Sequence, residues 1–195
     1  MKADLHIHSL ISDGDSTISE IIDIAYKKKL DVIAITDHDT TTHIKQLPAN
    51  PKIKIIAGIE ISAIDNQTGI RADILGYGIK DLDLIEKAVS RPGYIDVSDA
   101  VNVIQKSGGA AVLAHSGRQK NFYLAAQLPF DGIEYNHPSN SDIDKKIIRN
   151  YASRYGLFLT GGSDFHGKND TEPVEIGDYL SPQSINRIFS FLLAS

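Results

Sequence analysis

The sequence predicts an α/β protein whose strands form a closed or distorted barrel. Short apolar runs alternate with amphipathic helical patterns along the chain, an order that favours a parallel sheet covered by helices. About seven strands are expected and no Gly-x-Gly-x-x-Gly sequence is present, so a barrel is preferred over a doubly wound sheet. Histidines and acids follow several of these strands, as expected for residues at a barrel mouth.

The strands are predicted from short runs of aliphatic and β-branched residues. The first has alternating character, and the later ones are typical of buried strands bounded by polar or glycine-containing segments. A further strand is expected around Ile133. The other predicted strands cover residues 3–8, 31–36, 53–59, 72–77, 110–114 and 157–160.

The helices are predicted from capping residues and apolar stripes. Thr17 and Glu20 form a capping box at the start of the first helix. Ser98 is expected to cap a helix that Gly108 and Gly109 end, and Pro182 suits the first turn of the last helix. The remaining helices are expected over residues 82–89, 142–155 and 183–193.

Composition restricts the class of protein. A chain of 195 residues, 42% hydrophobic and 23% charged, suits one globular domain over residues 1–195. The absence of cysteine excludes disulfides and thiolate metal sites, so any metal must be held by imidazole and carboxylate. The net charge of −5 argues against a broad basic surface for long nucleic acids. No signal peptide or membrane-spanning run is seen, so a cytoplasmic location is expected, without a membrane partner.

The candidate site residues begin with two histidines at the start of the chain. His6 and His8 are two apart on a predicted strand, so their side chains project to one face. Asp13 lies in the loop that follows. His38, between two aspartates, comes directly after the second buried strand, where uncompensated charge is costly. These residue types at strand ends indicate a metal site.

Later strands lead to further residues of the same kind. Glu60 and His115 each follow a buried run, and a carboxylate at such a position can bridge two metals. Asp164 and His166 stand two apart in a glycine-rich loop after the last strand. Several clusters at strand ends together predict a polynuclear metal site in a hydrolase.

Together these motifs resemble the PHP (polymerase and histidinol phosphatase) superfamily, and within it the stand-alone bacterial phosphoesterases. The resemblance runs from Asp4 to about Gly167, with the motifs in family order. It implies a distorted (β/α)7 TIM-like barrel with two or three divalent metals at the carboxyl ends of its strands. The motifs are Asp4-x-His6-x-His8, Asp13-Gly14, Thr36-Asp37-His38-Asp39, Gly58-Ile59-Glu60, Ala114-His115 and Gly162-Ser163-Asp164-Phe165-His166-Gly167.

The resemblance also implies a set of ligands for each metal. Carried over by position, the first metal is held by His6, His8, Glu60 and Asp164. Glu60 also bridges to the second metal, which His115 binds, and the third is held by Asp13, His38 and His166. Manganese, iron, zinc and magnesium all suit such ligands.

The chain departs from the family pattern at two places. Asp73 stands where the family normally has a histidine ligand of the second metal. It either ligates in its place, which favours manganese or magnesium, or does not reach the metal. Arg91 and Pro92 are followed almost at once by the next helix and strand, so the helical insertion of nucleotide-phosphatase relatives is essentially missing. Substrates carried over from those relatives are therefore in doubt.

Two further residues are candidates for catalysis. Arg118 either binds phosphate, since a guanidinium suits bidentate binding of phosphate oxygens, or is a surface arginine with no role in catalysis. His137 ends a strand and either contacts phosphate, protonates the leaving oxygen, or makes a structural hydrogen bond. Asp37 or Asp39 is a candidate for orienting the ligands. Asp4 either orients an imidazole or is a surface acid at the other end of the barrel.

The predicted function is a metal-dependent phosphoesterase that hydrolyses its ester with a metal-bound hydroxide. The same residue types serve two alternatives, a metal-dependent amidohydrolase and a non-catalytic metal-binding PHP module. The expected substrate is a small phosphoester or nucleotide, or the end of a short oligonucleotide. The sequence does not identify the substrate or the oligomeric state.

Overall fold

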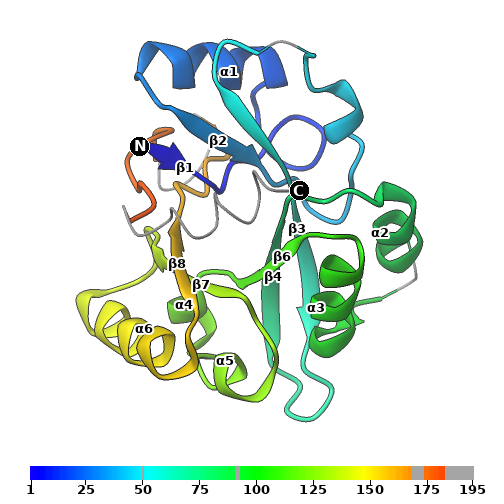
Figure 1. Ribbon diagram of the computed structural model, residues 1–195, viewed down its shortest axis with the longest axis vertical. Coiled ribbons are helices and arrows are strands. Elements are labelled where there is room, and N and C mark those ends of the chain that lie inside the picture. Colours follow the sequence, from blue (N-terminus) through cyan, green and yellow to red (C-terminus); the bar gives the residue numbers. More distant parts are fainter. Residues whose placement is uncertain (50, 91–92, 168–173, 183–195) are drawn as a thin grey trace.

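The computed structural model describes residues 1–49, 51–90, 93–167 and 174–182. It has an α/β fold in which one twisted sheet curves into a nearly closed barrel, with helices around its outside (Figure 1). The strand path is β1-β2-β3-β4-β6-β7-β8, and β5 pairs with β3 off this path. The predicted distorted barrel without an inserted helical domain is confirmed.

Most predicted strands agree with the structure to within a residue or two, but the first and third do not. The regular part of the first strand is only two residues long, because the chain beyond it pairs through an isolated bridge. The third strand extends past Glu60 to Ile64. The strands are β1 (Ala3–Asp4), β2 (Val32–Ile35), β3 (Lys54–Ile64), β4 (Arg71–Tyr77), β5 (Ile95–Asp96), β6 (Ala110–Leu113), β7 (Gly132–Asn136) and β8 (Phe158–Gly161).

The helices form where their caps predict them, with one correction. Thr17 and Glu20 make the predicted capping box, and Gly156 ends α6 at a φ of 70°. The helix predicted to follow Ser98 is instead capped by Asp96, whose carboxylate accepts the Ser98 N–H. The helices are α1 (Ile18–Lys27), η1 (Ile44–Gln46), α2 (Leu82–Val89), α3 (Val97–Lys106), α4 (Ser116–Gln119), α5 (Leu124–Gln127) and α6 (Asp142–Tyr155).

One strand runs against the others in the barrel. β4 is antiparallel to both β3 and β6, whereas the β1–β2, β2–β3, β6–β7 and β7–β8 pairs are parallel. The short turn after Ile64 allows only this reversal, because a parallel connection needs a crossover of about a dozen residues or more. The expectation of repeated parallel units is therefore wrong at β4. As a result, the amino end of β4 lies beside the carboxyl ends of its neighbours.

The barrel closes where the chain after β1 meets the end of β8. The Leu5 N–H donates to the Gly161 carbonyl at 3.2 Å, and Ile7 forms a parallel bridge with Phe165. Gly162 lies so close to His6 that an added Cβ would be 2.3 Å from the His6 Cβ and 2.4 Å from its backbone nitrogen. A side chain at residue 162 therefore cannot be accommodated without movement of His6.

The apolar core lies on both sides of the sheet. One cluster, with members from β1, β2, β3, β4 and β6, fills the barrel, and Tyr77 closes it by donating its hydroxyl to the Leu5 carbonyl at 2.8 Å. Two further clusters pack the helices against the outer face, one beneath α1 and one beneath α2, α3, α5 and α6. Burial of all these side chains is the main source of stability.

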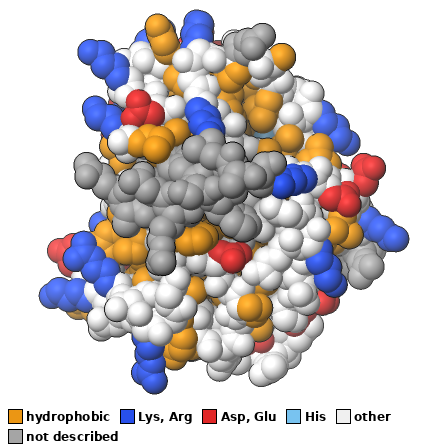
Figure 2. All heavy atoms as spheres, viewed as in Figure 1, with side chains coloured by type: hydrophobic (Ala, Val, Ile, Leu, Met, Phe, Trp, Pro, Cys, Tyr) orange, Lys and Arg blue, Asp and Glu red, His pale blue; other side chains and the backbone are white. Residues whose placement is uncertain are grey.

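No helix among the described residues is both long and apolar enough to cross a membrane. On the face seen in Figure 2, the described Lys and Arg side chains are scattered and form no continuous basic surface. The helix predicted over residues 183–193, and Arg91 and Pro92, lie outside the described residues.

Candidate metal centre

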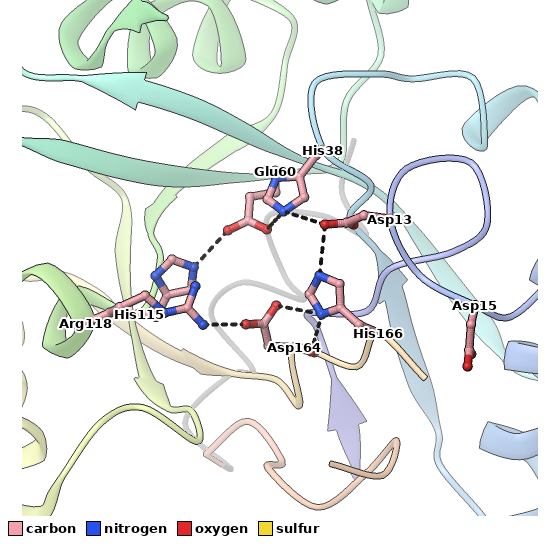
Figure 3. A pocket seen from close by; sticks show the side chains of 8 residues that line it. All are labelled: Asp13, Asp15, His38, Glu60, His115, Arg118, Asp164 and His166. Carbon is pink, nitrogen blue, oxygen red and sulfur yellow. Dashed lines mark hydrogen bonds and ion pairs between the residues drawn. The ribbon is translucent and has the colours of Figure 1, made fainter. Parts of the chain in front are cut away.

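The residues predicted for the site converge on one pocket of about 590 Å³. The pocket lies at the end of the barrel formed by the carboxyl ends of the parallel strands and the amino end of β4. Its lining side chains point toward one another in Figure 3, except for Asp15, which lies apart. They are Asp13, Asp15, His38, Glu60, His115, Arg118, Asp164 and His166.

Glu60 is the central side chain of the site. It is fully buried, and its Oε2 lies 2.9 Å from His6 Nε2, 3.1 Å from His8 Nε2 and 3.5 Å from His38 Nε2. Its Oε1 lies 3.1 Å from His115 Nε2. Burial alone would raise the pKa of Glu60, but the surrounding histidines hold it well below its usual value. Each carboxylate oxygen thus faces a different set of imidazoles.

Asp164 faces the same imidazoles from the loop after β8. Its Oδ1 lies 3.2 Å from both His6 Nε2 and His8 Nε2. Its Oδ2 lies 3.0 Å from Arg118 Nη2 and 3.2 Å from His137 Nε2. The backbone of Asp164 has a φ of 55°, an unfavourable conformation for a residue other than glycine and one often found at functional sites.

A second group of ligand-type residues lies at the more open side of the pocket. Asp13 Oδ2 lies 3.4 Å from His166 Nε2 and 3.8 Å from His38 Nε2, and its Oδ1 lies 3.6 Å from His8 Nδ1. The His166 side chain lowers the pKa of Asp13, against a smaller opposing effect of burial. The carboxylate is therefore ionised and available to a cation.

Asp73 completes a third group with Glu60 and His115. Its Oδ2 lies 3.7 Å from His115 Nε2. Asp73 pairs with Ser62 across the β3–β4 ladder, and because side chains alternate along a strand it shares a face with Glu60. Burial and the Glu60 charge raise the pKa of Asp73. Asp73 therefore reaches the barrel mouth although it lies within β4, because β4 runs antiparallel to its neighbours. Glu60 likewise reaches the mouth from within β3.

These groups fit divalent cations in their chemistry and spacing. Within each group the potential ligand atoms all lie within 4.8 Å of one another. His8 is fully buried, and neither of its ring nitrogens has a hydrogen-bond partner among the described residues. Imidazole nitrogens and carboxylate oxygens suit zinc, iron and manganese, and a cation between them would satisfy these buried atoms. The groups that contain the predicted ligands are His6–His8–Glu60–Asp164, Glu60–Asp73–His115 and His8–Asp13–His38–His166, and two more, His6–Glu134–His137 and His115–His137–Asp164, meet the same distance limit.

Asp37 and His43 support the site rather than line it. Asp37 accepts hydrogen bonds from Ser9 N at 2.6 Å and Ser12 Oγ at 2.8 Å, which fixes the loop that carries Asp13. His43 is fully buried, with its Nε2 near the carbonyl oxygens of β2 and β3 and its Nδ1 3.2 Å from Asp37. It is therefore a buried structural residue.

Asp4 and Asp39 hold backbone segments in place. Asp4 is fully buried and accepts from Ser163 N at 2.9 Å and Gly177 N at 2.7 Å. Both interpretations of Asp4 were therefore wrong, since it neither bonds an imidazole nor lies on the surface. Burial raises the pKa of Asp4 to about 6. Asp39 accepts from Ser62 N at 2.9 Å.

Sequence reasoning missed one buried acid behind the site. Glu134 on β7 is fully buried, with its Oε1 3.1 Å from His6 Nδ1 and its Oε2 accepting the His115 N–H at 2.9 Å. The signal was available, because a carboxylate between Ile133 and Tyr135 in a predicted buried strand requires a partner.

The comparison with protein families agrees with this geometry. The model of the PHP domain matches residues 4–167, which contain every ligand-type residue described above. The chain belongs to the PHP family. The family resemblance read from the motifs is therefore confirmed.

Two relatives of this family match most of the chain. A phosphoribosyl 1,2-cyclic phosphate 1,2-diphosphodiesterase from Eggerthella lenta is 28% identical, with 86% of this chain and 95% of the relative covered. A 3',5'-nucleoside bisphosphate phosphatase from Chromobacterium violaceum is 26% identical, with 86% and 88% covered. These alignments extend over 249 and 250 positions, so the relatives contain segments that this chain of 195 residues lacks.

Two solved structures share the fold. A protein from Bifidobacterium adolescentis described as a candidate metal-dependent phosphoesterase has a TM-score of 0.82 at 19% identity, with 97% of this chain and 96% of that chain covered. An amidohydrolase from Chromobacterium violaceum with bound sulfate has a TM-score of 0.81 at 22% identity, covering 98% and 97%. These structures support the fold, whereas the family membership and the two hydrolase relatives indicate the activity: the chain is a metal-dependent phosphoesterase, that is, a hydrolase.

Proposed function

We propose that the protein hydrolyses a small phosphoester or nucleotide at a cluster of two or three divalent cations. The observation that carries the proposal is Glu60, whose two oxygens face separate groups of imidazoles while it is fully buried. Such a carboxylate suits a bridge between two cations. The proposed ligands are His6, His8, Asp13, His38, Glu60, Asp73, His115, Asp164 and His166.

The three groups of ligands differ in chemistry. His6, His8, Glu60 and Asp164 would hold the first cation, and His115 with Asp73 would hold the second through the other oxygen of Glu60. Asp13, His38 and His166 would hold a third, in the more open part of the pocket. When bound, these cations would supply the Lewis acidity that activates water and neutralises charge on the phosphate. The carboxylate of Asp73 favours manganese or magnesium at the second position.

Arg118 is proposed to bind the phosphate. Its side chain is about half exposed at the pocket, with Nη2 on Asp164 Oδ2, and it is the one lysine or arginine among the described residues lining the pocket. A guanidinium can donate two parallel hydrogen bonds to phosphate oxygens. Arg118 would therefore orient the ester next to the cation ligands and stabilise charge that develops on the equatorial oxygens.

His137 is proposed to donate a proton to the leaving oxygen. The Ser139 N–H donates to His137 Nδ1 at 3.1 Å, so in the neutral ring the proton is on Nε2. Nε2 lies 3.2 Å from Asp164 Oδ2 and has no hydrogen bond of good alignment to any described residue. Burial lowers the pKa of His137, so the free ring is neutral, and the form that would donate from Nε2 is the imidazolium, whose second proton on Nδ1 faces Ser139 Oγ at 2.8 Å.

The substrate class is proposed from the pocket and the relatives. The named relatives act on a cyclic phosphodiester and a nucleoside bisphosphate, and an Escherichia coli relative, 24% identical with 84% of each chain covered, is a 5'-3' exoribonuclease. This chain lacks segments present in the relatives, and we infer that its pocket of about 590 Å³ is less enclosed than theirs. A small phosphoester, a nucleotide or the end of a short oligonucleotide would fit it.

The test is hydrolysis of a substrate panel by purified protein with Mn²⁺, with metal content measured in parallel. The panel contains phosphomonoesters, cyclic and linear phosphodiesters, nucleotides, short oligonucleotides and amides. Asp164→Asn and His8→Ala should abolish phosphoester turnover with the fold retained, whereas Asp23→Asn, at an exposed ion pair with Lys52, should not.

The same panel separates the alternatives. Wild-type rates in pure Asp164→Asn protein would refute the assigned site. Turnover of amides alone would favour a metal-dependent amidohydrolase, the description that one structural neighbour has. A folded, cation-loaded protein that hydrolyses nothing in the panel would favour a non-catalytic metal-binding module.

A further inference from the structure

Glu134 lies directly behind the proposed cation ligands and outside the pocket. It is fully buried in the middle of β7 and is absent from the pocket lining. A buried carboxylate is costly unless both oxygens are satisfied. Its two oxygens make two contacts, one with the His6 ring and one with the His115 backbone. These two histidines belong to different proposed cation positions.

The contact with His6 determines which ring nitrogen is free. An ionised carboxylate only accepts hydrogen bonds, so the His6 Nδ1 that lies 3.1 Å from Glu134 Oε1 must be protonated. The other nitrogen, Nε2, faces Glu60 at 2.9 Å and Asp164 at 3.2 Å. The hydrogen bond therefore leaves the Nε2 lone pair directed at the first cation position.

The contact between Glu134 and His115 stabilises an unfavourable backbone conformation of His115. His115 directly follows β6 with a φ of 20° and a ψ of 48°, outside the regions that residues with a side chain prefer. Its N–H donates to Glu134 Oε2 at 2.9 Å, and its Nε2 faces Glu60 Oε1 at 3.1 Å. The same carboxylate thus fixes the backbone that directs His115 at the second cation position.

These contacts form a closed cycle of four residues, in which the His115 backbone N–H is one link. Glu134 contacts His6 and His115 on one side, and Glu60 contacts the same two histidines on the other. The two imidazoles are stacked, with ring centroids 5.7 Å apart and an interplanar angle of 20°. One strand, β7, therefore sets the position of ligands that come from the first and the middle parts of the chain.

We propose that Glu134 is a positioning residue that fixes the Nδ1–H form of His6 and the orientation of His115, so that both present Nε2 to the cations. This inference rests on the proposed metal-dependent function. It extends that function to Glu134, which would act through the two histidines rather than as a cation ligand of its own.

Glu134→Gln tests the role with almost no change in shape. A glutamine side chain has one acceptor oxygen, so it cannot accept from both His6 and His115. If its oxygen accepts the His115 N–H, its NH₂ group faces His6 Nδ1 and forces that atom to act as the acceptor. The His6 proton then moves to Nε2, where it competes with the cation. Loss of such an outer hydrogen bond typically weakens metal binding about 10–100-fold.

The matched control is Asp131→Asn. Asp131 also accepts a strand N–H, that of Ala111 at 2.9 Å, but at the other end of β6, away from the site. Zn²⁺ affinity is measured by competition with a chelator, and folding by circular dichroism. We expect Zn²⁺ binding about 10–100-fold weaker in Glu134→Gln and unchanged in Asp131→Asn. Wild-type affinity in folded Glu134→Gln would overturn the inference.

A second measurement uses the wild-type protein, in case Glu134→Gln does not fold. ¹⁵N NMR of the imidazole rings in Zn²⁺-loaded protein should show His6 with a proton on Nδ1 and the metal on Nε2. A His6 ring with Nδ1 free of a proton would overturn the inference. Substrate turnover is scored separately. Glu134-dependent Zn²⁺ binding without hydrolysis would refute only the proposed function, and hydrolysis with Glu134-independent binding would refute only the positioning role.

Discussion

Gly162→Ala should displace His6 and so weaken the first cation position. The added Cβ would lie 2.3 Å from the His6 Cβ and 2.8 Å from its Cα, whereas carbon atoms in contact are about 3.5–4.0 Å apart. The two segments must therefore separate by more than about 1 Å, and metal sites tolerate about 0.2 Å in ligand distance. Because the added Cβ would clash with backbone atoms of His6, which cannot easily move aside, we expect the unfolding free energy to fall by about 3 kcal/mol, the upper end of overpacking costs.

The assay combines urea denaturation with a Mn²⁺ titration. Gly76→Ala is the control, because its Cβ would meet only side-chain atoms of Ile59, Ile79 and Ile104 at 3.0–3.1 Å, in the apolar cluster on the face of β3 opposite to Glu60. We expect about 1–2 kcal/mol of lost stability in the control with Mn²⁺ affinity retained. Gly162→Ala should lose both stability and Mn²⁺ affinity. Wild-type Mn²⁺ affinity in Gly162→Ala would refute the reasoning that this close contact positions His6.

Three further predictions concern single residues. Asp73→Ala should lower the number of bound Mn²⁺ ions by one in metal analysis, and an unchanged number would mean that Asp73 does not ligate. His137→Ala should slow hydrolysis of an alkyl phosphoester about 10²–10⁴-fold, as for a lost general acid, and much less for a p-nitrophenyl ester; equal losses would exclude proton donation. Burial would lower the pKa of His8, but Asp164 and Glu60 raise it to about 9. The stability that this proton contributes is present below the unfolded value near 6.5 and is lost as pH rises through about 9. Chelator-treated protein should therefore lose about 3 kcal/mol between pH 6.5 and 9.5, measured by urea denaturation, and constant stability would refute this linkage.

The sequence was sufficient for the barrel and for the convergence of the proposed ligands, because both follow from local patterns. Apolar runs locate strands, and parallel strands carry the residues after them to one edge. The third strand was expected to end at Ile59, which left enough chain before Ala72 for a parallel crossover. Its true end at Ile64 leaves only residues 65–70 before β4, too few for a parallel crossover. The reversal of β4 therefore depends on a boundary that apolar patterns locate poorly.

The supporting acids could not be assigned from the sequence for a different reason. The roles of Asp4 and Glu134 depend on which backbone N–H groups and ring nitrogens lie next to them in space. Those partners are Ser163 and Gly177 for Asp4, and His115 and His6 for Glu134, each at least 19 residues away in the chain. Local spacing indicates a carboxylate that needs a partner but does not identify the partner.

The β3–β4 hairpin makes part of this site sensitive to changes in length. Glu60 and Asp73 face the same side only because the ladder pairs Ser62 with Asp73 across a turn between Ile64 and Arg71. Insertion of one residue within β4 before Asp73 would turn its side chain to the opposite face, since faces alternate with every residue. Elsewhere at the mouth, ligands in loops can absorb insertions by bulging outward. Insertions and deletions among related sequences should therefore occur mainly outside the β3–β4 ladder.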